Sequence, residues 1–174
     1  MRAVYSVDAS HFLFAGFAGW VWCWVRWWLP SPSGRKRYNV LAALNVITHE
    51  LVRVCNLTYI NAASVCELLE KLARKHAGGA VTVVLDNARY QRCAAVQGRA
   101  AALGIELLFL PPYSPNLSLI ERFWKFVKKQ ALYSKHYADF EAFRGAIDEV
   151  IDQAGRKHKK ELASLLTLRF QSFD

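Results

Sequence analysis

The first third of the chain has the pattern of hydrophobic positions that is typical of β-strands. Residues 3–10, "AVYSVDAS", are rich in β-branched and aromatic side chains, and residues 19–28, "GWVWCWVRWW", alternate large aromatics with smaller residues. Residues 29–37, "LPSPSGRKR", predict a turn, and strands follow at 38–48, "YNVLAALNVIT", and 51–56, "LVRVCN". Usual loop lengths then predict an antiparallel meander of about three strands.

The hydrophobic period changes to that of a helix at residues 61–76, "NAASVCELLEKLARKH", which end before Gly78 and Gly79 and predict a crossover helix. Two continuous apolar runs follow, "AVTVVLD" at 80–86 and "IELLFL" at 105–110. Such runs are typical of parallel strands buried on both faces. Residues 89–103 between them predict a helix, so the three segments make a βαβ unit.

Two amphipathic segments, at 117–132 and 139–155, and a last short helix at 161–168 after the basic run "RKHKK" complete the chain. In the first of them, one helical face is apolar and the other carries charged groups, namely Glu121, Lys125 and Lys128. No internal repeat or low-complexity linker interrupts the pattern. We therefore expect residues 1–174 to form one α/β domain with a mixed sheet.

Two features bear on the compartment. The most apolar segment, Phe12 to Val25, has 14 residues, fewer than the roughly 20 that a membrane-spanning helix needs. We interpret it as buried sheet, with membrane insertion as the minor alternative. Cysteines at 23, 55, 66 and 93 show neither zinc-site pairs nor the density of a disulfide framework. They predict buried thiols in a reducing cytoplasm.

The charge of the chain favours a polyanionic partner. Twenty-three Lys and Arg against fourteen Asp and Glu give a net charge of +9, and basic proteins bind nucleic acid by neutralising phosphates and releasing counterions. The alternative is a basic but otherwise ordinary soluble protein, and the charge alone does not separate the two.

Three carboxylates stand out by their places in this pattern. Asp86 ends the apolar run at 80–86, Asp8 lies within an apolar strand, and Glu121 is in the first turn of a helix. Singly, each has a simpler explanation: Asp86 as a turn or helix cap, Asp8 as a hydrogen-bonded position, and Glu121 as a first-turn acid or as a partner of Lys125. Gathered near the strand ends of one sheet, they would repel one another unless a cation lay between them.

Hard divalent ions such as Mg²⁺ and Mn²⁺ prefer oxygen ligands. Two such ions roughly 3.5 to 4 Å apart can activate the attacking oxygen and stabilise the leaving oxygen in phosphodiester chemistry. A basic protein around an acidic site of this kind suits an enzyme that cuts DNA.

The motifs "SVDASHF", "VLDNARYQRC" and "LGIELLFLPPYSPNLSLIERFWKFVKK" resemble the catalytic domain of a DDE transposase of the mariner-type superfamily and its bacterial insertion-sequence relatives. The 34 residues that separate Asp86 from Glu121 match this branch. The resemblance implies an RNase H-like fold, a mixed five-stranded sheet flanked by helices. It also implies that Asp8, Asp86 and Glu121 are the catalytic acids and ligands of two Mg²⁺ or Mn²⁺ ions, which cleave DNA strands and transfer them during transposition.

The resemblance also carries expectations about partners. Family members have helix-turn-helix DNA-binding domains before the catalytic domain, whereas Met1 lies seven residues before Asp8 here. We therefore expect such a domain to be absent from this chain and supplied by an upstream reading frame or a separate protein, unless the chain is a decayed fragment. We also expect the protein to form a homodimer and to be located in the cytoplasm, at the nucleoid. Another RNase H-like nuclease and an inactive remnant that only binds DNA or a partner are the alternatives.

The turn before Glu121 departs from the family at one point. Where the family has Asn-Pro before Ile-Glu, this chain has Ser118 and Leu119, and Ser118 can still cap the helix. Tyr113 and Ser114 match the family's turn motif, and turn chemistry alone explains them.

Basic residues in three places are candidates for contacts with DNA phosphates. The alternative for each is a solvated surface charge. They are Arg35, Lys36 and Arg37 in the predicted turn, Arg89 and Arg92 after Asp86, and Lys125, Lys128 and Lys129 on the Glu121 helix.

Overall fold

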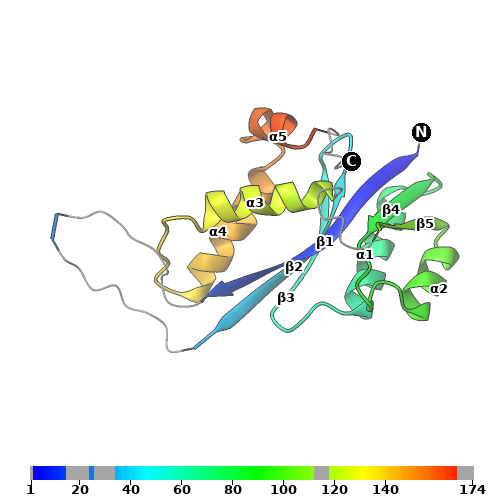
Figure 1. Ribbon diagram of the computed structural model, residues 1–174, viewed down its shortest axis with the longest axis horizontal. Coiled ribbons are helices and arrows are strands. Elements are labelled where there is room, and N and C mark those ends of the chain that lie inside the picture. The colour runs from blue at the N-terminus through cyan, green and yellow to red at the C-terminus, as the bar shows by residue number, and fades with distance from the viewer. Residues whose placement is uncertain (1, 15–23, 26–33, 112–117, 168–174) are drawn as a thin grey trace.

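The computed structural model describes residues 2–14, 24–25, 34–111 and 118–167 (Figure 1). Within them five strands and five helices follow one another along the chain. The strands are β1 (Ala3–Phe14), β2 (Lys36–Asn45), β3 (Leu51–Asn56), β4 (Val81–Leu85) and β5 (Ile105–Phe109). The helices are α1 (Ala62–Lys75), α2 (Ala94–Ala102), α3 (Leu119–Ala131), α4 (Phe140–Gln153) and α5 (Lys159–Leu165).

The five strands form one mixed sheet in the order β3-β2-β1-β4-β5. β1 pairs antiparallel with β2, and β2 pairs antiparallel with β3. β4 lies parallel to β1 on one side and to β5 on the other. The predicted antiparallel meander of three strands and the predicted βαβ unit are therefore confirmed. β1 is the central strand, and it is longer than the predicted segment at residues 3–10.

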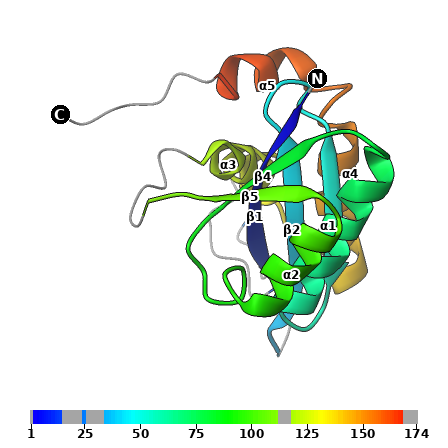
Figure 2. The ribbon, with the colours of Figure 1, turned by 90° about the vertical axis from the view of Figure 1, so that its right-hand side faces the viewer.

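Helices cover both faces of the sheet: in Figure 1, α3 and α4 lie on one side of β1 and β2 and α1 lies on the other, and Figure 2 shows the molecule from the side of α1 and α2. One apolar cluster lies between the sheet and α1 and α2, and it includes Tyr5, Leu41 and Leu69. The other lies between the sheet and α3, α4 and α5, and it includes Phe12 and Phe123. Because successive side chains of a strand point to opposite faces, β1 and β2 contribute alternate residues to the two clusters.

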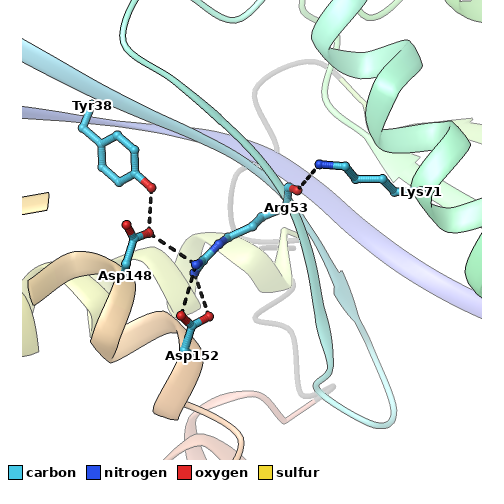
Figure 3. A network of polar contacts seen from close by, with 5 residues as sticks. All are labelled: Tyr38, Arg53, Lys71, Asp148 and Asp152. Carbon is cyan, nitrogen blue, oxygen red and sulfur yellow. Dashed lines mark hydrogen bonds and ion pairs between the residues drawn. The ribbon is translucent and has the colours of Figure 1, made fainter. Parts of the chain in front are cut away.

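A polar network ties α4 to the edge of the sheet (Figure 3). Asp148 of α4 accepts a hydrogen bond of 2.6 Å from the hydroxyl of Tyr38 and lies 3.4 Å from the guanidinium of Arg53. Arg53 also pairs with Asp152, one turn further along α4. Lys71 of α1 reaches the backbone carbonyl of Arg53, at 3.1 Å, from the opposite side of the sheet.

The interpretation of Phe12 to Val25 as buried sheet holds only in part. Phe12 and Phe14 are buried in β1, but Leu13 is about half exposed. Most of this segment and of the predicted Trp-rich strand at 19–28 lies outside the described residues. The two described residues of that strand, Trp24 and Val25, are exposed and form a bend. None of the described helices is long and apolar enough to cross a membrane.

Other predicted features are corrected by the structure. β5 is an edge strand rather than a strand buried on both faces, since Leu108 is 49% exposed. α2 begins at Ala94, and the residues from Arg89 to Cys93 precede it as a turn and bend. Cys55 is exposed, and Cys66 and Cys93 are half-buried free thiols, so the prediction of buried thiols is wrong for these three. Cys23 lies outside the described residues.

Candidate active site

The strand register places Asp8 and Asp86 side by side. β1 and β4 are parallel, with Ser6 opposite Val84. Continuing this register by two residues brings Asp8 opposite Asp86, which directly follows β4. Neighbouring strands lie about 4.8 Å apart. The two acids therefore emerge at the same point of the sheet, at the carboxyl end of β4, where loops are free to carry chemistry.

Helix α3 brings Glu121 to the same face of β1. Its apolar residues, among them Ile120, Phe123 and Val127, are buried against the sheet and α4, as the hydrophobic pattern predicted. The backbone amide of Ile120 donates a hydrogen bond of 3.5 Å to the hydroxyl of Ser6 on β1. Since alternate residues of a strand share a face, Asp8 and Ser10 lie on the face of β1 that Ser6 presents to α3.

The start of α3 differs from the expected cap. Ser118 occupies the N-cap position, but its side chain makes no capping hydrogen bond. The contact from Ser6 satisfies one amide of the first turn instead. Tyr113 and Ser114 lie outside the described residues.

A surface cavity of about 320 Å³ lies between β1 and α3. Asp8 and Glu121 contribute to its walls from the two elements, together with Lys125 and Lys128. Lys125 and Lys128 lie one and two turns after Glu121 on the same side of α3. Within the described parts of the chain Glu121 and Lys125 form no ion pair, so the i, i+4 pair does not explain Glu121.

The electrostatics of Asp8 show that the three acids are neighbours. The pKa of Asp8 is raised to about 6, first by burial and then by the charges of Asp86 and Glu121, against the lowering effect of the Ala9 backbone amide and of His11. A carboxyl group near others and away from water holds its proton more tightly. The structure therefore brings the negative charges of all three predicted acids within electrostatic reach of one another.

The three carboxylates do not lie close enough together in this structure to bind one metal ion jointly. Asp86 lies outside the residues that line the cavity. Its carboxylate accepts a 2.9 Å hydrogen bond from the backbone amide of Ala88, which is the turn role considered for it from the sequence. Within the described ranges, no three His, Cys, Asp or Glu side chains lie close enough together to hold a metal ion.

Four other residues line the cavity that were not among the predicted site residues, namely Ala9, Ser10, His11 and Trp124. His11 is opposite Asn39 on β2, and its Nδ1 lies 2.7 Å from the amide oxygen of Asn39. The amide nitrogen of Asn39 donates to the carbonyl of Thr58. Since a carbonyl only accepts, the Asn39 oxygen must face His11, and Nδ1 of His11 carries a proton. Two-residue spacing from Asp8 was the signal that could have found Ser10.

The predicted basic residues fall into two groups. Lys125 and Lys128 line the cavity, and Lys129 is exposed on the same helix. The remainder do not line it: Arg35, Lys36, Arg37, Arg89 and Arg92.

The predicted turn that was to hold Arg35, Lys36 and Arg37 is partly strand, because β2 begins at Lys36. Arg37 is opposite Leu13, five residues beyond Asp8 and so roughly 16 Å along β1. Lys36 lies over the ring of Phe140, at 5.6 Å, and Arg92 lies over the ring of Phe109, at 5.2 Å. These two cations therefore already have aromatic partners.

Solved structures that this chain is similar to include integrases and transposases. The Mos1 transposase in its paired-end complex with the left transposon end matches with a TM-score of 0.68 and 17% identity over 95% of this chain and 52% of that chain. The Mos1 mariner paired-end complex with Mn matches with a TM-score of 0.60 and 20% identity over 98% of this chain and 56% of that chain. The catalytic core domain of BIV integrase matches with a TM-score of 0.57 and 13% identity over 88% of this chain and 84% of that chain.

These matches establish the RNase H-like fold that the resemblance implied. The chain spans about half the length of the Mos1 transposase chains that it matches. No curated protein sequence matches the chain.

The sequence itself matches the family model described as DDE superfamily endonuclease over residues 26–144, which is more than half of the chain. The chain therefore belongs to the DDE superfamily of endonucleases, and the predicted resemblance is confirmed. Asp86 and Glu121 lie within the matched residues, whereas Asp8 precedes them.

Proposed function

We propose that the chain is the catalytic domain of a DDE transposase, which cleaves DNA strands and transfers them with the help of divalent metal ions. The observation that supports this most directly is that Asp8 on a strand interacts electrostatically with Asp86 at the end of the parallel neighbour and with Glu121 on a packed helix, in a chain of the DDE superfamily. The likeness to the Mos1 transposase and to retroviral integrases supports the same conclusion.

In this proposal Asp8, Asp86 and Glu121 hold two Mg²⁺ or Mn²⁺ ions. Their donor chemistry fits, because hard divalent ions select carboxylate oxygens and a cation offsets the burial and the repulsion that together raise the pKa of Asp8. The carboxylates must turn toward the ions from their present positions, and Asp86 must give up its contact with Ala88. When bound, the ions polarise the phosphodiester and activate the attacking oxygen. One neighbour is a Mos1 complex with Mn, and another is an HTLV-2 integrase core with magnesium.

DNA lies across the cavity in this proposal. Lys125 and Lys128 face phosphates there, and Lys129 and Arg89 add positive charge nearby on exposed surface. Arg35, Lys36, Arg37 and Arg92 serve DNA outside the cavity, since they lie away from its walls.

We propose that a helix-turn-helix domain, from an upstream frame or a separate protein, recognises the transposon ends, and that two copies of the catalytic domain work as a dimer on DNA in the cytoplasm. The Mos1 neighbours, described as a paired-end complex and a transpososome, support an assembly of this kind.

Cleavage of a labelled DNA duplex in Mg²⁺ or Mn²⁺ tests the proposal. We expect metal-dependent strand breaks that EDTA abolishes. Asp86→Asn and Glu121→Gln should each lower the rate by about a hundredfold or more, because each removes a charged metal ligand whose loss costs several kcal/mol in the transition state.

Glu67→Gln is the matched control, since Glu67 is an exposed acid on α1, at the opposite face of the sheet. Its rate should equal that of the wild type. Full activity of Asp86→Asn would disprove the assignment of the metal ligands. A wild-type chain that binds DNA without cutting it, even when it is joined to its upstream frame, would identify an inactive remnant.

A further inference from the structure

Exposed lysines and arginines gather on the side of the domain that α3 and α5 form. Within the described residues, none of them forms an ion pair. We call this set the α3–α5 basic surface. Its members are Lys125, Lys128 and Lys129 on α3, and Arg156, Lys157, Lys159 and Lys160 at the turn from α4 into α5. The second group comes from the basic run "RKHKK", to which the sequence pattern assigned no role.

Contacts at both ends of α5 hold it against α3. The ring of His158, the N-cap residue of α5, lies edge-on to the ring of Phe126, with 5.1 Å between their centroids. Arg122 of α3 donates a hydrogen bond of 2.9 Å to the carbonyl of Thr167, just beyond the other end of α5. Figure 1 and Figure 2 both show α5 beside α3. The cations of the two helices therefore share one side of the folded domain.

Lys129 connects the cavity with α5. Lys125 and Lys128 line the cavity that Asp8 and Glu121 also line. Lys129 follows Lys125 by four residues and the α5 contact, Phe126, by three, so it lies between the cavity and α5 on the exposed side of α3. The α3–α5 basic surface therefore runs from the wall of the cavity, across α3, to the start of α5.

The cations on the opposite face of the sheet are paired. Lys71 and Lys75 of α1 lie 2.9 and 3.0 Å from glutamates, and Arg99 of α2 lies 2.6 Å from a third glutamate. On α5 the acid is Glu161, and it lies 3.7 Å from His158. Acids of the fold thus neutralise the cations of α1 and α2 but not those of the α3–α5 basic surface.

Folding does not account for the cations at the start of α5. The dipole of a helix favours acids in its first turn and cations in its last turn. Lys128 and Lys129 occupy the last turn of α3, as the dipole favours, whereas Lys159 and Lys160 are the first two residues of α5. Neighbouring like charges also repel one another. A polyanion from outside the chain would relieve both unfavourable interactions.

We propose that the α3–α5 basic surface binds the phosphate backbone of duplex DNA where the duplex extends away from the carboxylate site. Cations bind phosphates without reading sequence, and they release counterions as they do so. The surface therefore supplies affinity and orientation rather than a choice of sequence. Its α5 part lies one packed helix beyond α3, roughly 8 to 10 Å away, the usual distance between helix axes. This inference rests on the proposed function, which makes DNA the substrate.

The salt dependence of DNA binding tests the proposal without relying on cleavage. The anisotropy of a fluorescein-labelled duplex in Ca²⁺, at several KCl concentrations, gives the slope of log K against log salt. The double variant Lys159→Gln and Lys160→Gln should reduce the magnitude of this slope by about two, because each phosphate contact accounts for about one released counterion. At 0.1 M salt its binding should be about tenfold to a hundredfold weaker, and the difference should vanish toward 1 M.

A double variant of equal charge on α1 is the matched control. Arg74 and Lys75 are also adjacent helical cations, but they lie on the opposite face of the sheet and pair with glutamates. Arg74→Gln with Lys75→Gln lowers the net charge by the same amount, and its slope should stay close to that of the wild type. Equal slopes for the two double variants would overturn the proposal, because net charge alone would then set the affinity.

Stability and cleavage distinguish the ways in which the proposal could fail. The urea midpoint of the α5 double variant should equal or exceed that of the wild type, since the substitutions relieve the first turn of α5. A lowered midpoint with a wild-type slope would give the two lysines a structural role and overturn the proposal. Weaker binding of this variant to phosphatidylserine vesicles, with an unchanged DNA slope, would assign the surface to a membrane instead.

Cleavage by the wild type separates this inference from the proposed function. A wild type that binds and cuts DNA, beside an α5 double variant with the wild-type slope, would overturn the α3–α5 basic surface and leave the proposed function standing. A wild type that neither binds nor cuts DNA would overturn the proposed function, and this inference with it.

Discussion

At the scale of single residues, Asp8 makes stability depend on pH in an unusual direction. Its pKa is about 6 in the folded protein against an ordinary value of 3.8 for an Asp side chain. Between these values the folded state binds more protons at this residue than the unfolded chain does, so the free energy of unfolding falls as the pH rises from about 4 to about 6. Ionised Asp8 then costs up to about 3 kcal/mol above that window.

Asp8→Asn should therefore be more stable than the wild type at pH 7.5 in metal-free buffer, by as much as about 2 to 3 kcal/mol, with the difference much smaller at pH 4. Urea unfolding at the two pH values measures it. A ligated cation stabilises only the protein that holds it, so Mg²⁺ should raise the unfolding free energy of the wild type more than that of the variant. An equal difference at both pH values would show that Asp8 is not strained by burial and by its neighbours.

At the scale of elements, a hydrogen bond to the neighbouring strand β1, rather than an N-cap side chain, positions the start of α3. The Ile120 amide donates to Ser6 at 3.5 Å, whereas the side chain of Ser118 makes no capping hydrogen bond. Ser6→Ala should lower the unfolding free energy by about 0.5 to 1 kcal/mol, and Ser118→Ala should change it by less. Chemical denaturation of the two variants distinguishes them. The reverse order would return the capping role to Ser118.

The elements were predictable where local pattern decides them. Asn61 and Ser64 give α1 a complete capping box, and the apolar face of α3 is visible in its spacing. Burial of β5 was not predictable, because an apolar run does not say whether a strand is central or at an edge. The burial of the Ser10 hydroxyl and the Trp124 indole nitrogen without hydrogen-bond partners also escaped prediction, since it depends on how α3 packs against β1.

The candidate acids were predictable for a different reason. The 34 residues between Asp86 and Glu121 match the spacing of the family that the sequence resembles. The register that sets Asp8 beside Asp86 is instead a property of the folded sheet. Nothing in the sequence showed that Asp86 would turn back to the Ala88 amide. The positions of the acids could therefore be predicted, and the orientations of their side chains could not.

At the scale of the whole molecule, the site depends on helices that do not carry it. α3 shares its apolar cluster with α4 and α5. The network around Asp148 fixes α4 to β2 and β3, so the layer behind Glu121 is attached to the sheet at its far edge (Figure 3). Burial raises the pKa of Tyr38, and the hydrogen bond to Asp148 adds to that effect.

Asp148→Ala should lower the unfolding free energy by about 1 to 3 kcal/mol, because it leaves the hydroxyl of Tyr38, a residue only 4% exposed, without an acceptor. Asp152→Ala is the matched control, since Asp152 pairs with the same Arg53 but its side chain is 66% exposed. Its loss should cost less than about 1 kcal/mol, as an exposed ion pair does. Urea unfolding followed by tryptophan fluorescence and by far-UV circular dichroism should show one coincident transition for both variants, since the helices on this face share one core. If the two signals separated for Asp148→Ala, α4 would come away from the sheet before the rest unfolds, and the network would stabilise that helix rather than the whole domain.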